Sequence, residues 1–264
     1  MQISGSQEAA RKVSEYGLPA DVVIVADYRV IEWLLRPAHA RWTVRFATNE
    51  LVIAYSERSK YASEISPDNW PAILLRPGVK VARADENLAP VGYQTLLCWQ
   101  LAAIKYRALL KGRDLAATLL ARTSEDLVRP DVTGLVPLIG TRADYAFVYR
   151  SVAYGHNLPY VRLPGEVNLA DPSQAAFYGQ AHVQLPEPKR TVDGAPIVYG
   201  LTIALNAPHP EAATVFVEAL LGAGGRKVLE RNGFTPLPEP VCSDPPGYLP
   251  QPLREFARSD RVTP

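Results

Sequence analysis

The chain has 264 residues, of which 47% are hydrophobic, and a formal net charge of +1 at pH 7. This length and composition allow a large buried core in one or two domains. The near-neutral charge provides no electrostatic basis for binding nucleic acid or an acidic membrane surface. Two cysteines are too few for a disulfide framework, and their spacing is not that of metal ligands.

The first residues show neither a basic segment nor an apolar one, so the chain as written has no recognisable signal peptide. No apolar run is long enough to span a bilayer. Two interpretations stay open at this point: a cytoplasmic protein, or a fragment or mature form whose leader is missing.

Helix and strand patterns alternate along the first third of the chain. A helix is predicted over residues 4–16, with Ser4 or Ser6 as its cap. Residues 21–26 are almost uniformly apolar, which predicts a strand buried on both faces of a parallel sheet. The next predicted elements are a helix over 30–35, strands over 43–47 and 51–55, a short helix beginning near 66–68, and a strand over 78–82.

A helix over residues 90–105 is the feature around which the chain is organised. Pro90 suits its first turn, and the backbone N–H of Val91 is the first without an intrahelical partner. No acidic side chain lies within this helix, so its amino end favours an anion. An ordinary core helix that happens to begin at a proline is the alternative.

The second half contains more strands and ends in a proline-rich tail. From residue 236 onward no regular element is predicted. Before the tail, the predicted elements are a helix over 109–124, strands over 144–149 and 160–163, a hairpin around 186–190, a long strand over 198–205, and helices over 210–221 and 225–231.

Two extended stretches, 51–55 and 198–205, are predicted to cross between two lobes. The first lobe would combine residues 1–52 and 200–264, and the second would contain residues 53–199. A site between lobes joined by such strands is common in proteins that close on a ligand.

Several segments together resemble the molybdate/tungstate-binding proteins, which are solute receptors of ABC importers. The resemblance covers nearly the whole chain and is closest to the archaeal-type group of that family. The segments that carry it most specifically are Ala-Pro-Val-Gly-Tyr at 89–93, Asp-Tyr-Ala-Phe-Val-Tyr-Arg-Ser-Val-Ala at 144–153 and Pro-Ile-Val-Tyr-Gly-Leu-Thr at 196–202.

The resemblance implies a two-lobed α/β fold of the periplasmic-binding-protein type II, with two crossover strands as a hinge. It implies a dehydrated oxyanion held by hydroxyl and backbone N–H groups, and no other cofactor. Carried over by motif, the ligand-binding groups would be the Ser6 hydroxyl, the Val91 backbone N–H, the Tyr149 phenol and Asp131. The protein would be a monomeric, extracytoplasmic receptor that delivers its ligand to an ABC transporter permease.

The carboxylates depart from the family pattern. In the archaeal-type group two carboxylates bond the metal directly; Asp131 matches one of them, while Ala89 occupies the position of the other. A carboxylate that does not bond the metal, at about 4 Å from the anion, would cost roughly 4 kcal/mol per charge pair at an effective dielectric near 20. Asp131 must therefore bond the metal, be protonated or point away.

The family also begins with a strand and a hydroxyl-bearing loop that this chain does not show, which predicts a shortened chain. The alternatives for function are a receptor for sulfate or phosphate and an intracellular oxyanion-sensing domain. An enzyme is not expected, because no nucleophile–base pairing and no nucleotide-binding motif is found. Without the resemblance, Ser6 would be interpreted as a helix cap and Tyr149 as a core aromatic residue.

Overall fold

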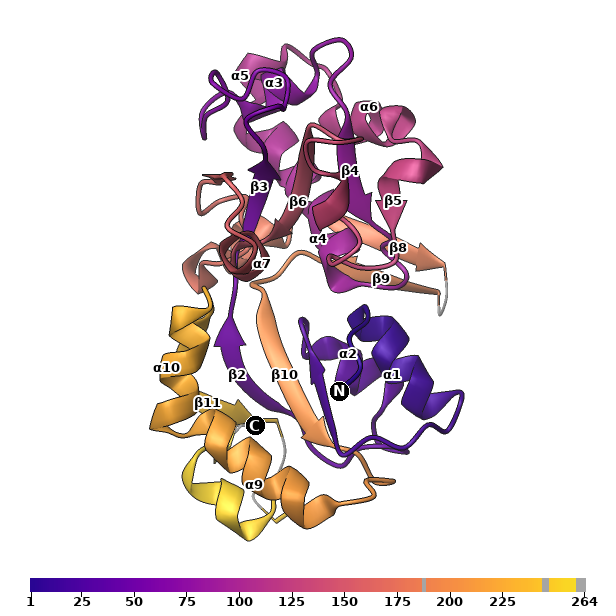
Figure 1. The fold of residues 1–264 in the computed structure, drawn as a ribbon, viewed down its shortest axis with the longest axis vertical. Helices are drawn as coiled ribbons and strands as arrows, with labels where there is room; N and C mark the ends of the chain where they lie inside the picture. The colour runs from indigo at the N-terminus through magenta and orange to yellow at the C-terminus, as the bar shows by residue number, and fades with distance from the viewer. Residues whose placement is uncertain (187–188, 244–246, 260–264) are drawn as a thin grey trace. The chain divides into compact units, whose positions relative to one another are not determined.

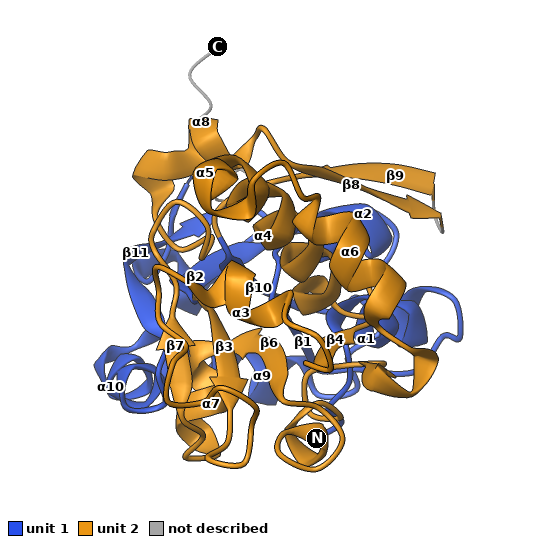
Figure 2. Cartoon of the chain, turned by 90° about the horizontal axis from the view of Figure 1, so that it is seen from above, with its two compact units in different colours: residues 1–49, 197–264 blue, residues 50–196 orange. Residues whose placement is uncertain are grey.

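The computed structural model describes residues 1–186, 189–243 and 247–259 (Figure 1). Contacts between residues divide the chain into two compact units, coloured separately in Figure 2. Unit 1 combines residues 1–49 with 197–264, and unit 2 contains residues 50–196. The lobes predicted from the sequence, 1–52 with 200–264 and 53–199, stay a prediction. In the described residues, no helix has both the length and the apolar character required to cross a bilayer.

Unit 1 is built on a five-stranded sheet with helices on both faces (Figure 1). Val23 and Val25 of the first strand pack against the first two helices. Val22 packs against a second hydrophobic cluster, which contains Phe46 and Val217. The strand order is β1 (Val22–Val25), β10 (Val198–Ile203), β2 (Val44–Thr48), β11 (Thr235–Cys242) and β12 (Arg258–Ser259). The helices are α1 (Ser6–Ser14), α2 (Arg29–Leu34), α9 (Pro210–Leu221) and α10 (Ala223–Arg231), with a 3-10 turn at Gln251–Glu255.

Unit 2 has a mixed five-stranded sheet and a separate hairpin. In strand order the sheet contains β5 (Val128–Arg129), β4 (Val81–Ala84), β6 (Tyr145–Tyr149), β3 (Leu51–Tyr55) and β7 (Tyr160–Arg162). The helices are α3 (Trp70–Leu74), α4 (Pro90–Lys105), α5 (Arg107–Leu110), α6 (Leu115–Arg122), α7 (Arg150–Gly155) and α8 (Ala175–Tyr178), with 3-10 turns at Glu125–Leu127, Val136–Leu138 and Pro172–Gln174. The hairpin pairs β8 (His182–Pro186) with β9 (Lys189–Asp193); residues 187 and 188 of the predicted turn lie outside the described residues.

An aromatic cluster forms the core of unit 2. Phe147 of β6 makes edge-to-face contacts with Trp70 of α3 and Trp99 of α4, with ring centroids 5.7 Å and 5.6 Å apart. Phe147 and both indole side chains are fully buried. These contacts bind β6, which ends at Tyr149, to α4, which begins at Pro90, so the cluster positions the two elements on which the site is predicted.

The helix predicted over 90–105 is confirmed, and twelve of its first thirteen residues are buried. The strand predicted over 21–26 is placed wrongly, because β1 lies at the edge of its sheet and pairs antiparallel with β10. Ile24 is 40% exposed, so this strand is not buried on both faces. A short apolar run by itself does not distinguish an edge strand from a central one.

The two stretches predicted to cross between lobes each pair within one sheet. β3 pairs along its length with β6 and β7 inside unit 2, and β10 pairs with β1 and β2 inside unit 1. The chain changes unit at residues 49–50 and 196–197, next to these two stretches. Both strands satisfy their backbone hydrogen bonds within one sheet, which leaves the connections to span the boundary.

The proline-rich tail contains a strand that the sequence did not predict. β11 pairs antiparallel with β2 at residues 235–236 and again at 241–242, and the register shifts between these two pairs. Pro238 and Pro240 lie in the bulge, where their missing N–H groups take nothing from the ladder. The predicted helix over 109–124 is likewise divided into α5 and α6, because Lys111 and Gly112 adopt positive φ angles of 51° and 80°.

Candidate ligand-binding site

The amino end of α4 has the geometry expected of an anion site. Ala89 is extended, with φ −139° and ψ 136°, as the residue before a proline prefers, and Pro90 opens the helix. The Val91 N–H has no hydrogen-bond acceptor within the described part of the chain, and the first turn contains no acidic residue. Val91 is almost completely buried, so an anion that reached this N–H would be shielded from water.

Gly92 allows the first turn of α4 to pack directly on the preceding loop. A Cβ at this position would lie 2.5 Å from the carbonyl carbon and oxygen of Asp85 and 2.6 Å from the nitrogen of Glu86. These are backbone atoms, which cannot move aside as a flexible side chain can. The position of the Val91 N–H therefore depends on a glycine one residue later.

Replacing Gly92 with alanine is expected to lower the free energy of unfolding by about 1–3 kcal/mol, the usual range for overpacking, and to weaken anion binding. Urea denaturation and a ligand titration would measure the two effects. Gly224→Ala is a suitable control, because Gly224 lies in α10 and an added Cβ there meets nothing within 4 Å. A Gly92→Ala protein as stable as the parent would show that the loop is not packed as described.

Tyr149 reaches the same turn of α4 from the end of β6. Its hydroxyl donates a hydrogen bond of 2.7 Å to Oε1 of Gln94, three residues after Val91 in the helix. Tyr149 is 3% exposed and Gln94 is 2% exposed. Two of the predicted site residues, Val91 and Tyr149, are thus brought together through a residue that the sequence analysis did not single out. A polar side chain three residues after Val91, in the buried part of a largely apolar helix, was the signal that could have found it.

Asp131 lies in the loop after β5 and is held by that loop. Its Oδ1 accepts hydrogen bonds from the backbone N–H and hydroxyl of Thr133, at 2.9 Å and 2.6 Å, and from the Gly134 N–H at 3.1 Å. The loop is tied to the residues before α4, because the Asp85 N–H donates to the Arg129 carbonyl at 2.8 Å. No described contact joins the Asp131 carboxylate to Val91 or Tyr149.

The two carboxylates nearest to Ala89 in the sequence are already engaged. Asp85 Oδ1 accepts the Asn87 N–H at 2.7 Å, and Glu86 forms an ion pair with Arg83. A replacement for the carboxylate missing at Ala89 would have to break one of these interactions.

Ser6 belongs to unit 1 and is not a helix cap. The N-cap of α1 is Gly5, and no side chain caps the helix. The Ser6 Oγ instead accepts a 2.9 Å hydrogen bond from the Ala26 N–H, just after β1, and the residue is 7% exposed. Since the oxygen acts as the acceptor, the hydroxyl hydrogen is left to donate. Its predicted contact with a ligand stays a prediction.

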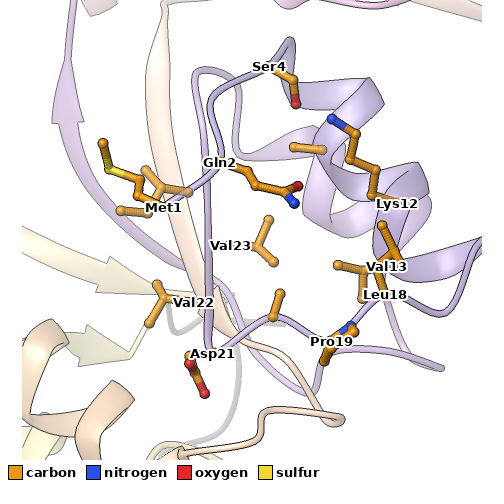
Figure 3. Close-up of a pocket in the computed structure, with 13 residues that line it drawn as sticks. Met1, Gln2, Ser4, Lys12, Val13, Leu18, Pro19, Asp21, Val22 and Val23 are labelled. Atoms are coloured by element: carbon orange, nitrogen blue, oxygen red, sulfur yellow. The ribbon is translucent and has the colours of Figure 1, made fainter.

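Unit 1 also has a cavity of about 460 Å³ between α1 and the edge strand β1 (Figure 3). None of the four predicted site residues lines it. Most of its lining residues are apolar, and Lys12 and Asp21 contribute charged side chains. This cavity is therefore not the anion site predicted from the sequence.

Comparison with known proteins gives consistent results. A family model described as bacterial extracellular solute-binding protein matches residues 2–235. The chain is 39% identical to an uncharacterized solute-binding protein of Petrotoga mobilis over 266 residues, which covers 97% of this chain and 80% of that protein. It is 38% identical over 264 residues to the molybdate/tungstate-binding protein WtpA of Pyrococcus abyssi, with 91% and 75% of the two chains covered.

Solved structures resemble this fold at low sequence identity. The periplasmic molybdate-binding protein of Azotobacter vinelandii gives a TM-score of 0.60 at 15% identity, covering 89% of this chain and 86% of that one. The sulfate-binding protein SubI of Mycobacterium tuberculosis gives 0.58 at 18% identity, covering 89% and 74%. The predicted α/β fold class, that of type II periplasmic binding proteins, is confirmed. The chain belongs to the family of bacterial extracellular solute-binding proteins.

Proposed function

We propose that this protein is an extracytoplasmic receptor that binds molybdate or tungstate and delivers it to the permease of an ABC importer. The amino end of α4 supports the proposal most directly, because it presents a buried backbone N–H with no acidic side chain in its first turn. The relatives named for molybdate and tungstate support this choice of ligand. The groups proposed to bind it are Ser6, Val91, Asp131 and Tyr149, with Asp131 as a direct ligand of the metal.

The proposed role is transport without chemical change of the ligand. The donors at α4 can hold an anion, and the proposal needs no nucleophile or general base. We propose that the receptor acts as a monomer outside the cytoplasm, in the periplasm or held at the membrane. It requires no cofactor besides its cargo.

Receptors for sulfate or phosphate would use the same kinds of donor, and Ala89 favours this alternative because it supplies no second carboxylate. Isothermal titration calorimetry with molybdate, tungstate and sulfate separates the two. If a carboxylate bonds the metal, the metal oxyanions should bind more tightly than sulfate by orders of magnitude, because their coordination can expand. Equal or tighter binding of sulfate would reject the molybdate/tungstate assignment. An absence of binding to all three anions would reject an oxyanion receptor.

Tyr149→Phe is expected to weaken tungstate binding by about 1–3 kcal/mol, because a buried polar group loses its hydrogen-bond partner. Calorimetric dissociation constants of the variant and the parent would measure this. Tyr145→Phe is a matched control on the same strand, since the Tyr145 hydroxyl donates to the Lys60 carbonyl and not to α4. An unchanged dissociation constant for Tyr149→Phe would remove Tyr149 from the site.

A further inference from the structure

The carboxamide of Gln94 is fixed on one side and open on the other. Its Oε1 accepts the Tyr149 hydroxyl at 2.7 Å, and the residue is 2% exposed. Among the residues that the structure describes, no acceptor pairs with its Nε2. This nitrogen is not fully enclosed by protein, so its two hydrogens can bind a molecule that reaches the amino end of α4.

The position of Gln94 in α4 directs this nitrogen toward the anion site. Side chains of an α-helix lean toward its amino end, and residues three apart lie on the same face. Gln94 therefore extends over the turn that carries the Val91 N–H. Because Oε1 is the end that accepts the Tyr149 hydrogen bond, the N–H₂ group is the end left to donate.

The phenol of Tyr149 cannot serve two acceptors at once. A hydroxyl has one hydrogen, and in this structure that hydrogen is directed at Gln94. A direct donation from Tyr149 to an oxyanion would break this bond and leave the buried Gln94 oxygen without its donor. The amide nitrogen of Gln94 can bind the anion without any such loss.

We propose that Gln94 is a further ligand-binding residue, whose Nε2 donates to the oxyanion beside the Val91 N–H, and that Tyr149 is a positioning residue that orients it. This inference rests on the proposed function and changes the role of Tyr149 within it. The anion would then be bound by two amide donors of α4, one from the backbone and one from a side chain.

A double-mutant cycle of Gln94→Met and Tyr149→Phe with tungstate as the titrant tests the inference. Methionine keeps the length of the side chain and removes both the donor and the acceptor. Gln94→Met should weaken binding by about 10- to 150-fold, the range for a hydrogen bond to a charged group. Adding Tyr149→Phe to it should change the dissociation constant by less than about threefold, because Tyr149 would have nothing left to orient.

The competing arrangement, in which Tyr149 itself donates to the anion, predicts different changes in affinity. If Tyr149 donates directly to the anion, Gln94→Met frees its hydrogen and binding becomes tighter or stays the same. Tyr149→Phe would then weaken binding as much in the Gln94→Met background as in the parent. Either result would overturn the inference.

Gln94→Glu guards against loss of folding by the methionine variant. Glutamate keeps an acceptor for the Tyr149 hydroxyl, has no amide donor and adds a negative charge. If the side chain faces the anion, binding should therefore fall by more than about tenfold, and if it faces elsewhere the affinity should stay unchanged. Gln100→Met is the matched control, because the Gln100 carboxamide lies further along α4 and pairs with the backbone of His182; it should leave the affinity unchanged. Normal parent binding with unchanged Gln94 variants would reject this inference alone. A parent protein that binds no oxyanion would reject the proposed function and the inference with it.

Discussion

Replacing Asp131 with asparagine is expected to weaken tungstate binding and to tighten sulfate binding. If the carboxylate bonds the metal, its removal costs tungstate a direct ligand. Sulfate cannot expand its coordination, so for sulfate the same carboxylate is only a repelling charge. That repulsion is roughly 4 kcal/mol per charge pair at 4 Å and an effective dielectric near 20. Changes of at least about tenfold in opposite directions are expected.

The local structure makes asparagine a clean substitution. Asp131 holds its loop through Oδ1, which accepts from Thr133 and Gly134, and the asparagine carbonyl can accept the same hydrogen bonds. Asp171→Asn is the matched control, since Asp171 caps a turn of unit 2 through the Ser173 N–H in the same way. Calorimetry with both anions measures the effect.

Three outcomes are informative for Asp131. Opposite changes for tungstate and sulfate support a metal-bonding carboxylate. Tighter binding of both anions would mean that the carboxylate lies near the guest without bonding it. An unchanged affinity for both anions would place Asp131 outside the site, with the loop as its only role.

Phe147→Ala is expected to lower the free energy of unfolding of unit 2 by about 3–5 kcal/mol, the largest effect on stability predicted here. The substitution leaves a cavity at the centre of the aromatic cluster and removes two edge-to-face contacts, with Trp70 and Trp99. Because Phe147 lies two residues before Tyr149 on β6, ligand affinity should fall as well. Urea denaturation followed by tryptophan fluorescence would measure the stability, since both indoles touch the altered ring.

Two variants calibrate this prediction. Phe147→Leu retains most of the volume and should cost clearly less than Phe147→Ala. Phe216→Ala, at a position of unit 1 that is 50% exposed, should change stability by no more than about 0.5 kcal/mol. Because the chain has two compact units, the transitions should be tested against a fit with more than one step. A loss below about 1 kcal/mol for Phe147→Ala would show that the cluster does not organise unit 2.

The sequence by itself determined the features that depend on neighbouring residues. Pro90 and the apolar, acid-free run after it specify the start, length and burial of α4, because these follow from local backbone preferences. The five-residue run ending at Tyr149 is a strand for the same reason. The motif resemblance also identified the family correctly, since the quoted segments extend over nearly the whole chain.

Only the tertiary structure decided which distant residues meet. The edge position of β1 and the pairing of β11 with β2 depend on strands far apart in the chain, and short apolar or proline-rich runs do not encode their partners. The same holds for the Tyr149–Gln94 hydrogen bond, which joins the end of a strand to the first turns of a helix 55 residues earlier. Local preference determined where each polar group lies along its helix or strand. The packing of β6 against α4 determined which of these groups face each other.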